Sequence, residues 1–235
     1  MANKITKLML NWEEYEIREY QEWGWQPWVN TVAYYPLTSF FTVNDIVGNY
    51  NLTNTWDVSF GTYQWVNCAY FNWTTNSQLY NTSLSFPSYP TQTVLVWMYI
   101  DWTGNIYQTI YHIWTTAQNW MLGSWYNQNY TSLSLSSWHE IYESTKAWNL
   151  NWNWHLLTNV TNWNSSIQYI DGQQYQTFTN SLSATQTWLY IGWAYDRQSE
   201  RLTGYESELI IEDKARTAQE IADYFNQTKS LYGIN

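Results

Sequence analysis

The sequence is short of glycine and cysteine, and it lacks a long apolar run. Only nine of its 235 residues are glycine, although its short runs and polar breaks are typical of a turn-rich protein. Cys68 is the single cysteine, which excludes an internal disulfide. No segment reaches the roughly 18 consecutive apolar residues that a membrane-spanning helix needs.

Charged residues are also scarce, and their balance is acidic. They make up 12% of the chain, and the formal net charge is −10. Nucleic acids and anionic membranes attract basic patches, so we expect neither of them as a partner. The N-terminal stretch MANKITKLML has no long apolar region and no small-residue cleavage site. It therefore predicts no signal peptide and synthesis in a cytoplasm.

What remains is the pattern of a β protein. Runs such as TVLVWMYID and WLYIGWAYD alternate with breaks rich in Asn, Ser and Thr, at spacings typical of a sandwich. Only TAQEIADYFNQTKSLYG predicts a helix, with Thr217 and Glu220 as a capping box and Gly233 as the stop signal. The sequence therefore predicts an all-β fold with one C-terminal α-helix, from Ala218 to about residue 230.

The pattern also divides the chain into three parts. Residues 1–22 predict an N-terminal β-hairpin that serves as a separate attachment segment. Residues 23–30 contain Gly24 and Pro27 and predict a linker. Residues 31–235 are long enough to form one domain with its own core.

Tryptophan is abundant where glycine is scarce. Six of the 19 tryptophans directly follow an asparagine, whereas Asn-Gly, the dipeptide most typical of tight hairpins, never occurs. Both central residues of such a turn take positive φ angles, which glycine adopts more easily than tryptophan. Three explanations stay open: genuine aromatics, platforms on which sugar rings stack, or positions at which the natural protein has glycine because its gene reads UGA as glycine.

Six segments of the main domain carry a resemblance to a known family. In chain order they are YYPLTSFFTVNDIVGNYNLT, CAYFNWTTNSQLYN, TVLVWMYI, NWHLLTNVTNWNSSIQYIDGQ, LYIGWAYD and GYESELIIEDKARTAQEI. They resemble the motifs of the laminin-G-like, concanavalin A-like jelly rolls of bacteria and phages, over about residues 34–234. The resemblance implies a jelly-roll sandwich of two antiparallel sheets that binds carbohydrate or protein.

The resemblance sharpens the prediction about tryptophan, because the family has glycine where this chain has Trp73 and Trp163. Trp97 and Trp154 lie within β runs and are expected to be genuine core aromatics. The UGA explanation predicts that most of the tryptophans are glycine in the natural protein. The tryptophans named in particular follow Asn or Asp at strand ends or lie at family glycines: Trp12, Trp73, Trp102, Trp120, Trp163 and Trp193.

Calcium is the cofactor that the resemblance implies. Asp45 and Asn49 in NDIVGN, together with Glu208, match the places where calcium-binding relatives hold their ion. Carboxylate and amide oxygens are the ligands that calcium prefers. The alternative is that Asp45 and Asn49 only form a turn. The sequence assigns no residue to carbohydrate binding.

A catalytic pair of carboxylates is not predicted. Glu206 and Glu208 lie two residues apart and are expected to share one strand face, but with Glu212 they do not match the Glu-x-Asp-x-x-Glu pattern of glucanase-like relatives. The main hypothesis is therefore a non-catalytic module that binds a glycan or a surface protein, on a virion or an extracellular surface. The alternatives are a glycoside hydrolase or lyase of the same fold, and a purely structural virion subunit that assembles as an oligomer.

Overall fold

A computed structural model describes most of the chain, in two compact units. The units are Met1–Asn30 and Thr31–Asn235. None of the helices in the described part is long and apolar enough to cross a membrane. The described residues are 6–10, 13–17, 29–38, 43–55, 57–74, 76–84, 91–101, 108–115, 121–127, 130–134, 140–141, 150, 152–163, 165–179, 186–194 and 197–235.

The first unit contains a two-stranded hairpin. Strand β1 (Thr6–Leu10) pairs antiparallel with β2 (Glu13–Ile17), within the segment where a hairpin is expected. Trp12 and most of the expected linker lie outside the described residues. The use of this hairpin for attachment stays a prediction.

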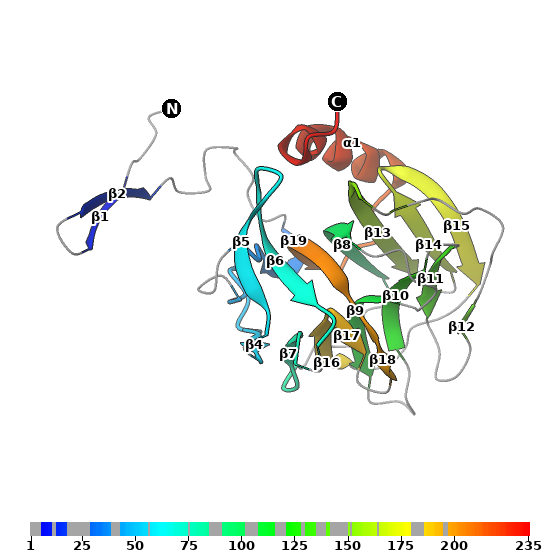
Figure 1. Cartoon of the computed structure of the whole chain (residues 1–235). Coiled ribbons are helices and arrows are strands. Elements are labelled where there is room, and N and C mark those ends of the chain that lie inside the picture. Colours follow the sequence, from blue (N-terminus) through cyan, green and yellow to red (C-terminus); the bar gives the residue numbers. More distant parts are fainter. Residues whose placement is uncertain are drawn as a thin grey trace. The chain divides into compact units, whose positions relative to one another are not determined.

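The second unit contains two large antiparallel sheets, as predicted (Figure 1). Eight described strands form one of them, in which β3 (Thr31–Tyr35) pairs with β19. The other strands of this sheet lie in the order β15 (Gln173–Thr179), β14 (Ser165–Ile170), β13 (Trp154–Asn162), β8 (Thr91–Ile100), β19 (Thr203–Glu212), β6 (Val66–Asn72) and β5 (Ser59–Tyr63).

Seven described strands form the other large sheet. Their order is β12 (Glu140–Ile141), β11 (Tyr130–Ser134), β10 (Met121–Asn127), β9 (Gln108–Thr115), β16 (Gln186–Ile191), β7 (Leu79–Asn81) and β4 (Thr53–Asn54). A separate short pair joins β17 (Trp193–Ala194) to β18 (Arg197–Arg201).

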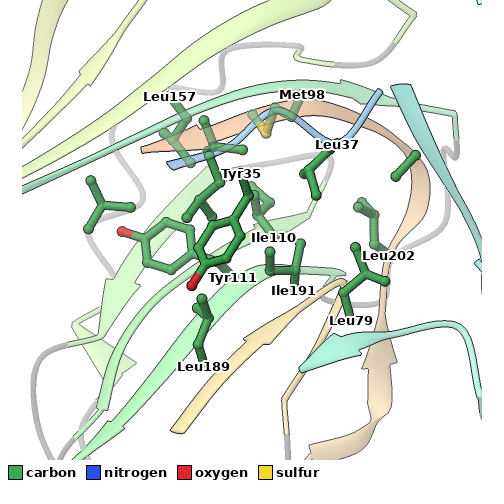
Figure 2. Close-up of a cluster of buried hydrophobic side chains, with 14 of the residues drawn as sticks. Tyr35, Leu37, Leu79, Met98, Ile110, Tyr111, Leu157, Leu189, Ile191 and Leu202 are labelled. Carbon is green, nitrogen blue, oxygen red and sulfur yellow. The ribbon is translucent and has the colours of Figure 1, made fainter. Parts of the chain in front are cut away.

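The core lies between the two large sheets. Figure 2 shows Met98 and Leu157 of the eight-stranded sheet close to Ile110, Leu189 and Ile191 of the seven-stranded sheet. All five side chains are completely buried. Burial of this apolar surface on the inner face of each sheet is the main force that holds the sandwich together.

The C-terminal helix covers part of the outer face of the eight-stranded sheet. Helix α1 (Ala218–Thr228) begins with the predicted capping box, and a 3₁₀ helix (Lys229–Tyr232) follows it and ends at Gly233. Trp97 of β8 stacks on Tyr232 with ring centroids 3.8 Å apart and lies 5.9 Å from Phe225. Trp97 and Trp154 are 0% and 2% exposed, so the prediction that they are core aromatics is confirmed.

Tryptophan does occupy turns with positive φ. The φ angles of Trp73 and Trp163, two of the residues predicted to replace glycine, are 66° and 49°. Trp65 and Trp152, which that prediction did not name in particular, have φ angles of 72° and 68°. Trp193 instead lies in β17 and is not among the described residues with positive φ. Trp102 and Trp120 lie outside the described residues.

Candidate functional site

Tyrosines gather on the part of the eight-stranded sheet where β5, β6 and β19 lie side by side. They line a shallow, open depression of about 240 Å³, which we call the tyrosine cleft. Its lining residues are Ser59, Phe60, Gly61, Thr62, Tyr63, Cys68, Tyr70 and Tyr205.

The register of the strands explains why these tyrosines meet. Tyr70 of β6 lies directly opposite Tyr205 of β19, and Tyr205 lies directly opposite Tyr99 of β8. Residues that face one another across neighbouring strands point to the same side of a sheet. Three tyrosines from distant parts of the sequence thus form one cross-strand row.

Tyr63 completes the cluster from the end of the edge strand β5. Its ring stacks on that of Tyr205, with centroids 4.1 Å apart and planes 10° from parallel. Its hydroxyl donates a hydrogen bond to the Tyr99 hydroxyl at 3.1 Å. Tyr70 lies against the opposite side of the group, 4.8 Å from Tyr205. These contacts hold the rings in fixed orientations, because each one rests on a neighbour.

The rings of the tyrosine cleft are only partly exposed, and their surroundings are weakly acidic. Tyr63, Tyr70 and Tyr205 are half-buried, whereas Tyr99 beneath them is 2% exposed. Burial first, and then the negative charge of Asp101, raise the pKa of Tyr205 to about 12. Burial also raises the pKa of the Cys68 thiol to about 12, so this cysteine is protonated and unreactive at neutral pH.

The three residues predicted to hold calcium do not form one cluster of ligands. Asp45 is buried, and both of its carboxylate oxygens accept backbone N–H groups: Oδ1 from Tyr34 and Val47, and Oδ2 from Gly48 and Tyr50. A carboxylate offers about four acceptor positions, so all of them are in use. This is the turn-forming role that was the alternative to calcium.

Glu208 contacts the side chain of Tyr34, the residue whose backbone contacts Asp45. The amide of Tyr34 donates to Asp45, and its hydroxyl donates to Glu208 at 3.1 Å. Glu208 also accepts a hydrogen bond from the Tyr224 hydroxyl on helix α1. Asn49 is exposed. Among the described residues, no group of three or more His, Cys, Asp or Glu side chains is arranged to hold a metal ion.

Glu206 and Glu208 do not share a strand face, which corrects the expectation from their spacing. The register of β19 shifts between them. Glu206 pairs with Met98, and Glu208 pairs with Trp97, the residue directly before Met98 in β8. Met98 belongs to the inner core, whereas Trp97 lies under the C-terminal helix. The carboxyls therefore lie on opposite faces, because a bulge inserts one extra residue.

The carboxyl of Glu206 is completely buried, and neither of its oxygens has a hydrogen-bond partner. Burial raises its pKa well above the ordinary value of 4.5. A pair of glycosidase carboxylates must reach one sugar from two sides. This pair is separated by the sheet itself and cannot do so.

The sequence did not identify the tyrosine cleft. Its signal was present as a tyrosine in each of the segments SFGTY, VNCAYFN and TGYESEL. What the sequence alone could not supply was the register that aligns Tyr70, Tyr99 and Tyr205, whose strands come from three distant segments.

Comparison with known proteins gives a fold but no family. No family model and no curated protein matches this sequence. The binding domain of Paraclostridial Mosquitocidal Protein 1 has a similar structure, with a TM-score of 0.68 and 13% identity over 87% of this chain and 55% of that one.

Two botulinum neurotoxin binding domains are also similar. The serotype D domain, solved in complex with N-acetylneuraminic acid, has a TM-score of 0.63 and 13% identity over 84% of this chain and 50% of its own. The DC domain, solved with rat synaptotagmin II, has a TM-score of 0.64 and 16% identity over 86% of this chain and 52% of its own. This chain thus spans about half the length of these solved domains.

Proposed function

We propose that this protein is a non-catalytic carbohydrate-binding module and that sugar rings bind in the tyrosine cleft. The observation that carries the proposal is the group of Tyr63, Tyr70 and Tyr205 on an open sheet face. Aromatic rings offer an apolar surface for the C–H face of a sugar, and tyrosine adds a polar hydroxyl at its rim. Ser59, on the same face of β5 as Tyr63, places a further hydroxyl at the border of the cleft.

The shape of the cleft suits a binding module. It is shallow and open, and its rings are held by mutual stacking before any ligand arrives. A preformed surface loses little conformational freedom on binding, which favours affinity. The similar toxin domains support the proposal, since one was solved with N-acetylneuraminic acid and another with the protein synaptotagmin II. A surface protein that carries glycans is therefore the expected partner.

The alternative of a glycoside hydrolase receives no support from the two carboxylates. Glu206 points into the core, and Glu208 is bonded to tyrosines near the helix. We retain display on a virion or an extracellular surface as part of the proposal, because the similar solved structures are binding domains and the N-terminal hairpin offers an attachment segment.

A glycan array with the purified protein tests the proposal. We expect binding to a subset of glycans, and we expect Tyr205→Ala to weaken it at least tenfold, since stacking on an aromatic ring is lost. Tyr80→Ala is the matched control, because Tyr80 is a half-buried tyrosine of the seven-stranded sheet and should leave binding unchanged. Release of reducing sugars from a bound glycan would contradict the non-catalytic reading.

A further inference from the structure

The electrostatic surroundings of the tyrosine cleft are one-sided. None of its eight lining residues is a lysine or an arginine. Asp101 follows Ile100 at the end of β8, two residues after Tyr99, and its backbone N–H donates to the Thr203 carbonyl of β19 at 3.0 Å, two residues before Tyr205. Burial is the main cause that raises the pKa of Tyr99 and Tyr205, and the charge of Asp101 adds to it. The chain as a whole carries a formal net charge of −10. A ligand that enters the cleft therefore meets neutral hydroxyls, aromatic rings and one nearby carboxylate.

Two cations of the sandwich, Arg216 and Lys214, are held in ion pairs. The Arg216 guanidinium forms a bidentate pair with the buried carboxylate of Glu212, at 2.5 and 2.8 Å. Lys214 is paired with Glu220 at the start of helix α1. Neither of these side chains lines the cleft.

From this distribution we infer that the tyrosine cleft binds a neutral glycan and discriminates against sialylated or otherwise anionic sugars. This inference rests on the proposed function and adds the chemical class of its ligand. Recognition of a sugar carboxylate ordinarily uses a cation or a set of N–H donors, because a desolvated charge without a partner is costly. Here the carboxylate of a sialic acid would find no cation in the lining and would be repelled by Asp101.

The expected ligand of this chain differs in charge from the sugar bound to one of its structural neighbours. The serotype D domain was solved with N-acetylneuraminic acid, an anionic sugar. A shared fold does not determine the ligand, which follows the side chains of the binding site. The tyrosine row and Asp101 thus point to a different ligand class on a shared scaffold.

A glycan array that contains matched neutral and sialylated versions of each glycan tests the inference. We expect the bound glycans to be neutral, and we expect each sialylated counterpart to bind at least tenfold more weakly. Asp101→Asn should reduce that ratio severalfold, because it removes the repelling charge, whereas Asp101→Glu should preserve it. Circular dichroism of each variant confirms that the sheets are intact.

The outcomes separate the two proposals. Sialylated glycans that bind as tightly as their neutral partners, in a manner that Tyr205→Ala abolishes, would overturn the neutral-ligand inference and leave the carbohydrate module standing. An unchanged ratio in a folded Asp101→Asn variant would overturn the role of Asp101. Absence of binding to every glycan at millimolar concentration would overturn the proposed function, and the inference with it.

Discussion

Trp65 and Gly172 occupy the same position in the same kind of turn. Each is the second of two residues that connect paired strands: Gln64 and Trp65 lie between β5 and β6, and Asp171 and Gly172 lie between β14 and β15. All four residues have positive φ, with 72° at Trp65 and 75° at Gly172. This is the two-residue hairpin turn that favours Asn-Gly and Asp-Gly.

The shared backbone conformation of Trp65 and Gly172 favours the explanation that the natural protein has glycine at some of the tryptophan positions. Trp65 is 96% exposed, so its side chain has little packing to offset the strain of its backbone. Trp163 is 65% exposed and also lies in a hairpin turn, between Asn162 of β13 and Ser165 of β14. We therefore place Trp65 and Trp152 beside the tryptophans named in particular as glycine in the natural protein. An intact mass of the protein from its native source that matches the 19-tryptophan sequence would contradict the prediction.

Replacement of Trp65 by glycine should stabilise the protein. A left-handed conformation costs an L-residue about 1 kcal/mol or slightly more, and glycine avoids that cost. We expect Trp65→Gly to raise the free energy of unfolding by about 1 kcal/mol, with the added freedom of the unfolded chain offsetting part of the gain. Urea unfolding followed by tryptophan fluorescence and circular dichroism gives the value. Weaker glycan binding by this variant would instead favour the sugar-stacking explanation.

The same substitution inside the fold should have the opposite effect. Trp154 is 2% exposed and lies 5.4 Å from Tyr232 and 5.8 Å from Tyr99. Trp154→Gly should therefore lower the free energy of unfolding by roughly 3–5 kcal/mol or more, as the loss of a large buried aromatic does. A folded variant with unchanged stability, measured by the same unfolding curve, would show that position 154 tolerates glycine.

Glu206 should make stability fall as the pH rises. Its folded-state pKa is raised well above 4.5, so the folded protein keeps the proton that the unfolded chain loses above pH 4.5. The cost grows by up to about 1.4 kcal/mol for each pH unit until the folded pKa is reached. Glu206→Gln should therefore match the parent protein near pH 4 and exceed it in stability at pH 7. If the variant and the parent protein were equally stable at pH 4 and at pH 7, the pKa of Glu206 would not be raised in the folded protein.

Asp45 should matter for the turn rather than for a metal. Asp45→Ala removes the acceptor of four backbone N–H groups, and we expect a loss of about 2–3 kcal/mol, since some of these groups can turn to water. Calcium at Asp45, Asn49 and Glu208, the cofactor expected from the sequence, is not tested by the structure, and thermal unfolding can test it. Because calcium would have to displace N–H donors, we expect no rise in Tm at millimolar calcium. A rise that Asp45→Asn abolishes would restore the calcium site.

Local sequence signals were sufficient for much of the fold. The capping box at Thr217 and Glu220, the buried Trp97 and the positive φ of Trp73 each depend on a few neighbouring residues or on a short pattern. In the stretch SIQYID of β14, side chains two residues apart share one face, and Ile167 and Tyr169 pack together near Ile221 of the helix.

The candidate site depends on information that no short pattern contains. The bulge in β19 reverses the face of Glu208 relative to Glu206, and it is visible only in the pairing with β8. The cleft requires Tyr70 and Tyr205 to lie opposite one another, although they are 135 positions apart in the sequence. Register between distant strands is set by the whole core, so these features needed the structure.

The central position of β19 has a consequence for how the chain reaches its native state. This strand follows all the other described strands in the sequence, yet it pairs with β3, β6 and β8. Before β19 is added, β6 and β8 have no strand between them, and the edges that pair with β19 remain without partners. Non-local pairing of this kind slows folding and exposes the chain to aggregation while it waits. We therefore expect a nascent chain that stops before residue 203 to depend on chaperones.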